Sequence, residues 1–423
     1  MDTLAPSGLS VGSSDFWRRP LDERMADLSA LREENGPFFP VELQGFVGDS
    51  HPFYAVVGHA ELVEISRHPK VFCSGQGSIA IQDMPEQAME FFGSLINMDD
   101  PRHARLRGIV NRSFIPKRLQ DVLDSVERIC SELIDEMCEK GEVDLVPALA
   151  APFPLLVICE MMGIPRSEFG TVLESTNIIL GAGDPEMLGG REPFGAIFEA
   201  GITLTGLMNE LATERRKNPT DDLTSALVHA NIDGEFLTPE EIGPFFILLA
   251  VAGNDTTRTA TSIGMHLLGE HPDQRRLWQD DMDAVTATAV EEIVRYGSPV
   301  TFMRRTVTHR TELSGHTFEA GEKVVLFYGA ANRDPAAFKD PDVFDVRRDP
   351  NPHVGFGGPG PHFCLGAHLA RRELSIVFRQ LFDRLRDIEP AGPPVHLEAN
   401  GIPLVGGVKH LPVRFTPTAP ARS

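Results

Sequence analysis

One segment constrains the fold more than any other, because residues 238–269 read as a single helix that is both long and apolar. Thr238 is placed to cap this helix, Pro239 stands at its first position, and Glu241 completes a capping box. The letters FFILLAVAG follow at residues 245–253 without a charge. We therefore predict a buried central helix that ends near Gly269.

The rest of the chain predicts more helices and a few strands. Residues 119–140 carry apolar side chains at helical spacing, at Val122, Val126, Ile129, Leu133 and Met137. Strand-like runs occur at residues 51–58 (HPFYAVVG) and 322–329 (EKVVLFYG). The expected fold class is mainly α with a smaller β portion.

Composition and charge limit the classes of function. No long linker or repeat interrupts the chain, so we expect one domain over residues 15–416, with loose ends at 1–14 and 417–423. The formal net charge of −22 argues against nucleic acid as a partner, because that partner needs clustered positive charge. No apolar run approaches the roughly 18 residues that cross a bilayer. The N-terminus lacks the basic and apolar regions of a signal peptide, so we expect a cytoplasmic protein without a membrane anchor.

Only one of the five cysteines, Cys364, has unusual neighbours. It stands between the glycine-rich segment GFGGPGPHF at residues 355–363 and a helical pattern that begins directly after it. A helix N-terminus favours the thiolate form of cysteine, and glycines let a backbone approach a flat ligand closely. Three interpretations compete: a structural cysteine, a catalytic nucleophile with His362 as its base, and a thiolate ligand to haem iron. The last fits the loop best.

The same loop resembles the haem-binding signature of the cytochrome P450 monooxygenase family, Phe-Gly-x-Gly-x-(His/Arg)-x-Cys-x-Gly. The matching residues are Gly358, Gly360, His362, Cys364 and Gly366. Phe356 lies eight residues before the cysteine instead of seven, so this loop has one extra residue. The resemblance implies that Cys364 is the axial thiolate ligand of haem b, with Phe356, His362 and Gly366 also at the cofactor.

Two more motifs of the family follow in the expected order. AGNDTT at residues 252–257 resembles the oxygen-activating segment of the family's central helix. EEIVR at residues 291–295 contains the Glu-x-x-Arg pair, Glu292 and Arg295, which the family combines with an arginine before the cysteine loop, here Arg348. The three motifs together imply the single-domain cytochrome P450 fold, with the long central helix over the haem.

The resemblance also implies how O2, the co-substrate, is activated. Asp255 and Thr256 would supply and position protons inside an otherwise apolar helix. Gly253 would leave room above the iron. A threonine in mid-helix can also donate to the carbonyl four residues back, here that of Ala252.

Basic side chains are implied as partners of the haem propionates. The family's pattern places His103, Arg107, Arg305 and His362 there. His103 and Arg107 are four residues apart and share a helix face. Arg304 is adjacent to Arg305 and could take its place, and each of these residues could instead be a surface charge.

Electrons have to come from other proteins, because the chain has no flavin- or nicotinamide-binding extension. Six arginine or lysine residues and no acid occur in residues 102–118, and Arg371 and Arg372 follow the cysteine. An acidic iron–sulfur ferredoxin could dock on such a patch, served by a ferredoxin reductase, so that NAD(P)H acts only indirectly. The alternative is a solvated helix face. The resemblance implies a monomer.

The expected substrate is apolar and lipid-like. The candidate pocket residues are Ile79, Phe92, Ile96, Leu249, Ala252 and Val300, although each is individually more typical of plain core. The stretches DFW, MDDPRHARLR, ICEMMGIP, ILGAGDPE, FFILLAVAGNDTTR, MRRT and NPHVGFGG resemble a bacterial branch of the family that oxidises methyl-branched lipids at the omega carbon and sterol side chains.

The implied reaction is hydroxylation of a terminal methyl group on an isoprenoid, a methyl-branched lipid or a sterol side chain. Alternatives are a monooxygenase of smaller terpenoids or polyketides, a peroxide-driven fatty-acid hydroxylase, and a non-enzymatic haem protein. The pair Asp255 and Thr256 argues against the last two, which have no use for it.

Overall fold

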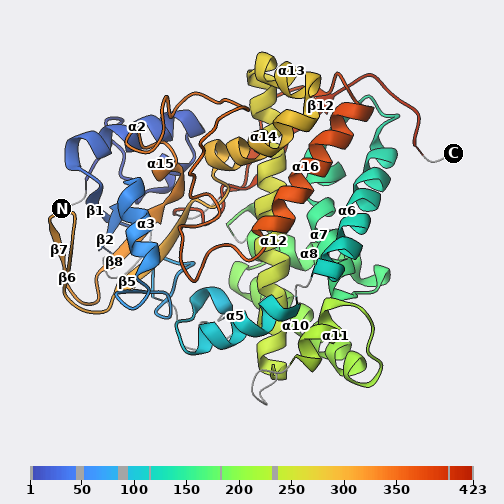
Figure 1. The fold of residues 1–423 in the computed structure, drawn as a ribbon, viewed down its shortest axis with the longest axis horizontal. Coiled ribbons are helices and arrows are strands. Elements are labelled where there is room, and N and C mark those ends of the chain that lie inside the picture. The colour runs from blue at the N-terminus through green and yellow to red at the C-terminus, as the bar shows by residue number, and fades with distance from the viewer. Residues whose placement is uncertain are drawn as a thin grey trace. The chain divides into compact units, whose positions relative to one another are not determined.

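The computed structural model describes residues 3–43, 52–83, 94–113, 116–181, 183–230, 237–398 and 401–421 (Figure 1). Its contacts divide the chain into two compact units. The sheet unit comprises Met1–Asp99, Glu291–Leu365 and Glu398–Gly406. The helical unit comprises Asp100–Val290, Gly366–Leu397 and Gly407–Ser423.

The sheet unit is built on a five-stranded sheet with the strand order β1-β2-β8-β5-β3. These strands are β1 (Phe38–Glu42), β2 (Pro52–Val56), β8 (Lys323–Phe327), β5 (Phe302–Val307) and β3 (Phe72–Cys73). β2 and β8 pair in parallel, and the other neighbours are antiparallel. A separate hairpin joins β6 (Thr311–Leu313) to β7 (His316–Phe318). The helices are α1 (Ser14–Trp17), α2 (Leu21–Asn35), α3 (His59–Arg67), α15 (Tyr328–Ala331) and a 3-10 turn at Leu95–Asn97.

The central strand β8 explains why this sheet is covered on both faces. Its sequence KVVLF is apolar at consecutive positions, and successive side chains of a strand point to opposite faces. Val324 and Val325 are both fully buried, and each belongs to a different apolar cluster. The sheet therefore carries a core on each face.

Part of the expected loose N-terminal end packs against the sheet unit. Val11 is fully buried, and the indole Nε1 of Trp17 donates to its carbonyl at 2.6 Å. Ala5 belongs to the same core cluster as Trp17. Short apolar side chains and one indole give this segment enough buried area to order it, which a search for low complexity does not detect.

The helical unit contains most of the helices. In chain order they are α5 (Arg102–Ser113), α6 (Pro116–Met137), η2 (Val146–Ala150, a π-helix), α7 (Pro152–Met162), η3 (Arg166–Glu168), α8 (Phe169–Leu180), α9 (Pro185–Leu188), α10 (Pro193–Lys217), α11 (Leu223–His229), α12 (Pro239–Glu270), α13 (Pro272–Asp280) and α16 (Ala367–Arg384). The short strands are β4 (Glu142–Asp144), β9 (Glu389–Pro390), β10 (Val395–His396), β11 (Val408–His410) and β12 (Pro412–Arg414). α14 (Met282–Gly297) begins in the helical unit and ends in the sheet unit.

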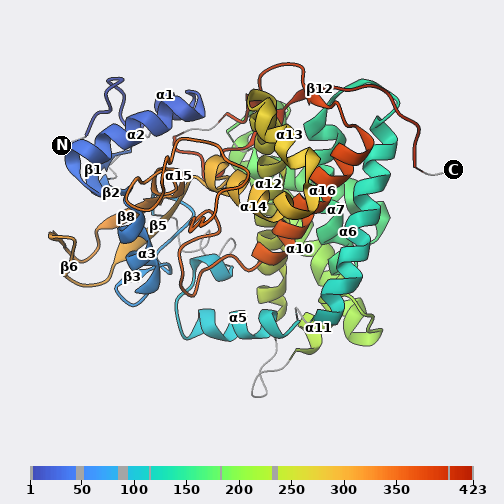
Figure 2. The same cartoon turned by 45° about the horizontal axis from the view of Figure 1, so that its top comes forward.

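The predicted central helix is α12, and it is one residue longer than expected, ending at Glu270. The backbone N–H of Thr238 donates to Oε2 of Glu241 at 3.1 Å, as a capping box requires. α7, α8, α10 and α16 pack along α12 (Figures 1 and 2). Helices therefore surround it within its own unit, which explains its apolar sequence.

The other expected elements have small differences at their ends. β2 and β8 occupy the predicted strands, but β8 stops at Phe327 because Tyr328 begins the short helix α15. The helix after Cys364 does not begin beside it: Gly366 is the N-cap and α16 starts at Ala367. The fold class, mainly α with a smaller β portion, is confirmed. Among the helices of the described ranges, none has the length and apolarity to cross a membrane.

Candidate active site

The loop before α16 is closed around Cys364. Its backbone N–H donates to the carbonyl of Phe356 at 2.9 Å, and the N–H of Phe363 donates to the carbonyl of Gly360 at 3.1 Å. Gly357 turns with φ +88°, a conformation that favours glycine. The extra residue of this loop therefore still leaves Phe356 hydrogen-bonded to the cysteine.

The glycines of this loop let it lie directly on the end of α3. A Cβ on Gly360 would lie 2.2 Å from the carbonyl oxygen of Ser66, and one on Gly358 would lie 2.5 Å from the Oγ of the same serine. Side chains at these positions would push the loop away from α3. The loop geometry thus depends on glycine at both positions.

Cys364 differs from the other cysteines in its exposure. It is partly exposed, whereas Cys73, Cys130, Cys138 and Cys159 are buried. Burial raises the pKa of the Cys159 thiol to about 12 and also raises that of Cys130, so both stay protonated. The structural interpretation fits those buried cysteines, and Cys364 is the one cysteine of the chain that is not buried.

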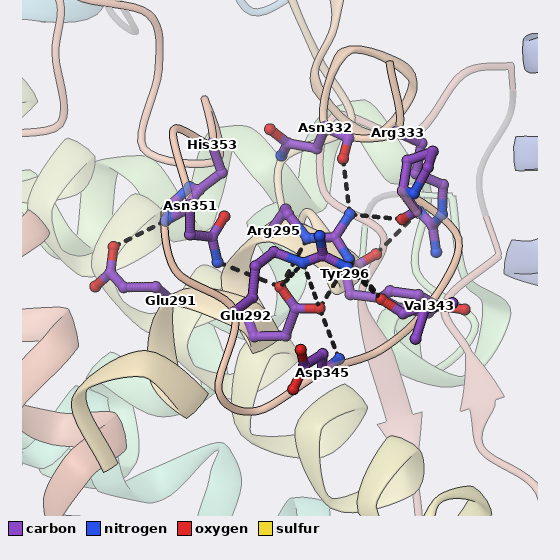
Figure 3. Close-up of polar contacts among 12 residues, drawn as sticks. Glu291, Glu292, Arg295, Tyr296, Asn332, Arg333, Val343, Asp345, Asn351 and His353 are labelled. Carbon is purple, nitrogen blue, oxygen red and sulfur yellow. Dashed lines mark hydrogen bonds and ion pairs between the residues drawn. The ribbon is translucent and has the colours of Figure 1, made fainter. Parts of the chain in front are cut away.

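A buried ion network holds the segment that leads into this loop (Figure 3). Glu292 and Arg295, on α14, are both fully buried and form a two-point ion pair, with Nε–Oε2 at 2.7 Å and Nη2–Oε1 at 2.8 Å. Nε of Arg348 lies 3.2 and 3.1 Å from the two oxygens of Glu292. The amide of Asn351 and the backbone N–H of Asp345 donate to the same carboxylate.

The two guanidinium groups of this network also bind backbone carbonyls. Arg295 donates to the carbonyls of Asn332, Pro341 and Val343. Arg348 donates to the carbonyls of Lys339, Asp340 and Val343. One carboxylate and two arginines thus hold residues 332–343 in place by hydrogen bonds, although this segment has little regular secondary structure.

Asn332 links the Glu292 network to the cysteine loop. Its side-chain carbonyl accepts from the backbone N–H of Val354 at 2.8 Å. Val354 in turn accepts from Gly357 at 2.9 Å, at the turn of the loop. The Glu292 network and the loop of Cys364 therefore form one continuous hydrogen-bonded structure.

The structure distinguishes the two adjacent arginines of β5. Arg304 donates to the carbonyls of Gln76, Ile81 and Gln82 and to the carboxylate of Asp83, so it has a structural function. Arg305 is 6% exposed, and among the described residues it forms no ion pair and donates only to the carbonyl of Arg304. Burial lowers the pKa of Arg305. A buried guanidinium with so few partners fits an anionic ligand such as a propionate.

The other proposed propionate partners lie on different elements. His103 and Arg107 are on α5; His103 is buried, with Nδ1 3.5 Å from a carboxylate oxygen of Asp100, and Arg107 is partly exposed. His362 is partly exposed in the cysteine loop, and Gly366 caps α16. His103 and Arg107 share one helix face, as their spacing predicts.

The side chain of Thr256 forms the hydrogen bond within α12 that we expected for a threonine in mid-helix. Its Oγ1 donates to the carbonyl of Ala252 at 2.8 Å. Leu248, Leu249, Ala252 and Thr256 are at least partly exposed, whereas Phe246, Ala250 and Asn254 are fully buried. A strip of α12 that includes Leu249, Ala252 and Thr256 is thus left uncovered within the helical unit.

Asp255 is next to this strip but is buried, at 2% exposure. Burial raises the pKa of its carboxyl group to about 6, and the positive charge of Arg258 acts in the opposite direction. Oδ1 has no hydrogen-bond partner among the described residues. A carboxyl group with a pKa close to neutrality and an unused oxygen is suited to exchange protons.

Gly253 faces a side chain of α7. A Cβ on this residue would lie 2.8 Å from Cδ1 of Ile158 on α7. A side chain at this position would therefore require the end of the Ile158 side chain to shift. The space that we expected here above a haem iron stays a prediction.

The expected substrate residues lie in two groups. Ile79 and Ile96 are partly exposed in the sheet unit, where the Oγ of Ser78 donates to the carbonyl of Ile96 at 2.7 Å. Val300, in the same unit, forms a β-bridge with Val405. Leu249 and Ala252 are on α12, and Phe92 lies outside the described residues.

Two buried ionisable residues were missed in the sequence. Glu373 on α16 is 3% exposed and accepts from Oγ1 of Thr257 at 3.2 Å; burial raises its pKa to about 8. Arg258 on α12 is 2% exposed. Both could have been found, because each is an ionisable residue at an otherwise core-facing position of an amphipathic or apolar helix.

These donors fit a haem with a thiolate ligand. One partly exposed cysteine lies in a glycine-rich loop, and a buried arginine with few partners among the described residues is suited to an anion. His103 and Arg107 add two more nitrogen donors on α5. That Cys364, Arg305, His103, Arg107 and His362 together hold the group stays a prediction.

Comparisons with known proteins agree with this chemistry. A family model described as Cytochrome P450 matches residues 195–387. The chain is 44% identical over 417 residues to a methyl-branched lipid omega-hydroxylase from Mycobacterium tuberculosis, covering 97% of this chain and 95% of that protein. It is 39% identical over 381 residues to a steroid C26-monooxygenase from Rhodococcus jostii, covering 89% of this chain and 78% of that protein.

A solved structure is similar over nearly the whole chain. It is a Mycobacterium marinum cytochrome P450 in complex with pseudoionone, with 38% sequence identity and a TM-score of 0.90. The match covers 98% of this chain and 100% of that structure.

Proposed function

Because the chain belongs to the cytochrome P450 family, and is therefore a haem-thiolate monooxygenase that uses O2, we propose that it hydroxylates the terminal methyl group of a branched lipid. The substrate would be a methyl-branched fatty acid, an isoprenoid or a sterol side chain. The main support for this proposal is the 44% identity, over 97% of the chain, to a protein named for omega-hydroxylation of methyl-branched lipids.

The apolar strip on α12 supports a lipid-like substrate. Ala252 and Leu249 are at least partly exposed one and two turns before Thr256, and neither side chain can bind a charged group. We propose these two residues, with Ile79, Ile96 and Val300, as substrate contacts. Few polar anchors suit a hydrocarbon chain whose terminal methyl group is the reacting part.

Cys364 is the proposed thiolate ligand. When bound, the haem supplies the iron at which dioxygen is reduced and a C–H bond is oxidised. The hydrogen bond from its own N–H to Phe356 and the Glu292 network constrain the backbone that carries the sulfur. Arg305, His103, Arg107 and His362 would neutralise the propionates.

Asp255 and Thr256 are the proposed proton donors. The hydroxyl of Thr256 donates to the carbonyl of Ala252, and its oxygen can still accept a hydrogen bond from another donor. Asp255 changes protonation state near neutral pH, so it can take a proton from water and release it again.

We propose that electrons come from an iron–sulfur ferredoxin and its reductase, as the family generally uses redox partners. Arg102 and Arg372 are exposed on α5 and α16, in a chain whose net charge is −22. Exposed arginines attract an acidic partner and raise its association rate. A monomer in the cytoplasm is the proposed state of the enzyme.

An optical titration of the ferric protein tests the substrate class. The panel is phytanic acid, a farnesyl derivative, a cholestenone, pseudoionone, and a linear fatty acid as control. A low-spin to high-spin shift with the long branched members, and little with the linear acid, supports the proposal. A response to pseudoionone alone would favour the second candidate, a monooxygenase of smaller terpenoids, which the ligand of the Mycobacterium marinum structure suggests.

Product analysis then locates the oxidised carbon. Each compound that shifts the spectrum is incubated with ferredoxin, reductase and NAD(P)H, and the product is identified by mass spectrometry. A terminal alcohol is expected. Hydroxylation at interior carbons of every substrate would refute the omega-hydroxylase assignment while leaving the monooxygenase assignment intact.

A further inference from the structure

α12 contains one pair of opposite charges in its buried part. From Phe245 to Met265, Asp255 and Arg258 are the only charged residues. They are three residues apart, so they share one face of the helix, and each is 2% exposed. A buried arginine is costly, and its retention in an otherwise uncharged stretch needs a reason.

This face of α12 meets the start of β11. A Cβ on Gly407 would lie 3.6 Å from Oδ1 of Asp255, so the backbone of this residue lies close to the carboxyl group. At the next residue, the carbonyl of Val408 accepts from Nε of Arg258 at 3.0 Å. Asp255 and Arg258 therefore lie against consecutive residues of one chain segment.

Arg258 also reaches α8. Its Nη1 donates to Oδ1 of Asn177 at 3.3 Å. Its partners on α8 and β11 are thus an amide and a carbonyl, which are neutral, and among the described residues Arg258 has no ion pair within 4.0 Å. Hydrogen bonds to neutral groups therefore hold the guanidinium, while Asp255, Asp144 and Asp184 act on its charge from beyond ion-pair distance.

The surrounding carboxylates have partners of their own. Asp184 is 3.0 Å from Nζ of Lys409, and Asp144 is 2.5 Å from Nδ1 of His410. The charged and titratable groups around the pair are Asp144, Asp184, Glu186, Lys409, His410 and, from α16 beside Thr257, Glu373. Asp255 is the carboxyl group on the helix face of Arg258, and it has an oxygen without a partner among the described residues.

We propose that Arg258 is a positioning residue for Asp255, which it serves by tying this face of α12 to β11 and α8 and by keeping a permanent positive charge one helical turn from the carboxyl group. This inference rests on the proposed proton delivery by Asp255. Arg258 favours the ionised carboxylate, so Asp255 can release its proton. Without that charge, burial alone would act on Asp255, and the acid would keep its proton to higher pH.

Infrared difference spectroscopy of the haem-loaded protein tests the proposal directly. The carbonyl band of protonated Asp255 is identified by its loss in Asp255→Asn and is followed as a function of pH. In the native protein its midpoint is expected near 6. In Arg258→Gln, whose amide can still donate to Val408, the midpoint should rise by about one pH unit or more.

Two further variants separate charge from packing. Arg258→Lys keeps the charge and should hold the midpoint near the native value. Arg275→Met is the matched control, because Arg275 on α13 also donates to a distant backbone carbonyl, that of Ile388, and it should leave the midpoint unchanged. The proposal is overturned if Arg258→Gln has native circular dichroism and the native pH midpoint of the Asp255 band. It is also overturned if the midpoint of Arg258→Gln is raised and that of Arg258→Lys is raised equally.

The result is distinguishable from a failure of the proposed function. If Asp255→Asn hydroxylates with undiminished coupling to NAD(P)H, Asp255 is not the proton donor, whatever the infrared midpoint. If Asp255→Asn lowers the coupling to NAD(P)H but the infrared midpoint of Asp255 is the same in the native protein and in Arg258→Gln, Arg258 has only a packing role.

Discussion

The backbone N–H of Cys364 donates to the carbonyl of Phe356 at 2.9 Å across an interval of eight residues. This bond closes the loop although the interval is one residue longer than in the family's signature. It also constrains the backbone on which the sulfur is carried. The identity of the residue at 364 can therefore be changed with the loop closure retained, because the bond uses only main-chain atoms.

Cys364→Ser is expected to abolish thiolate ligation. A hydroxyl is a poor anionic ligand at neutral pH, so the reduced carbon-monoxide complex should lose the red-shifted band that a thiolate produces. Cys159→Ala is the control, because this buried cysteine has no accessible sulfur and its removal should leave the band in place. A red-shifted band that persists in Cys364→Ser would refute the assignment.

Thr256→Ala should uncouple electron use from hydroxylation. Loss of a positioned proton donor lowers the ratio of product formed to NAD(P)H consumed by on the order of tenfold or more. The matched control is Thr259→Ala, on the same helix, because Oγ1 of Thr259 has no hydrogen-bond partner in the described part of the chain. Equal coupling in the two variants would exclude a special role for Thr256.

Glu292→Gln should destabilise the segment before the cysteine loop. Arg295 and Arg348 would be left without their shared anion, and breaking a buried pair in this way costs about 3–5 kcal/mol in the free energy of unfolding. We expect a lower melting temperature and a lower haem content after purification. Glu291→Gln is the neighbouring control: Glu291 pairs with His353 at 2.8 Å and its side chain is 26% exposed. A native haem content in Glu292→Gln would contradict the link between this network and the loop.

Arg304 and Arg305 should separate into a structural and a cofactor residue. Arg304→Leu removes hydrogen bonds to several carbonyls and should lower the free energy of unfolding by about 2–4 kcal/mol. Arg305→Leu removes one hydrogen bond and a buried charge, so the stability of the apoprotein should hardly fall. Its haem, however, should transfer faster to a haem-scavenging globin. Faster transfer in Arg304→Leu alone would reverse the two assignments.

The accuracy of sequence reasoning depended on how local each feature is. The capping residues and apolar run of α12 are contiguous, so that helix could be predicted to within one residue of its end. The choice between Arg304 and Arg305 could not be made, because neighbouring residues of a strand face opposite ways and only the pairing of β5 with β8 assigns the faces. The bond from Arg258 to Val408 joins residues 150 positions apart, and no periodicity reports such a contact. Gly253 was interpreted from its motif, whereas the packing against Ile158 requires the path of α7.

Glu373 should make the stability of the protein depend on pH. Burial raises its folded-state pKa to about 8 from an ordinary value of 4.5, so the folded protein holds a proton that the unfolded chain has already released. Stability from this group is complete below the ordinary value and is lost as the pH rises to about 8. Across that window the free energy of unfolding should fall by an amount on the order of a few kcal/mol.

The variant Glu373→Gln tests this dependence, because an amide does not titrate but can still accept from Thr257. Denaturant unfolding at a series of pH values should give a flatter profile than the native protein between about pH 4.5 and 8. Glu389→Gln, a partly exposed glutamate paired with Arg414, should keep the native slope. If Glu373→Gln retained the full slope, the buried acid would have to be ionised in the folded state, with a counter-charge beyond its bond to Thr257.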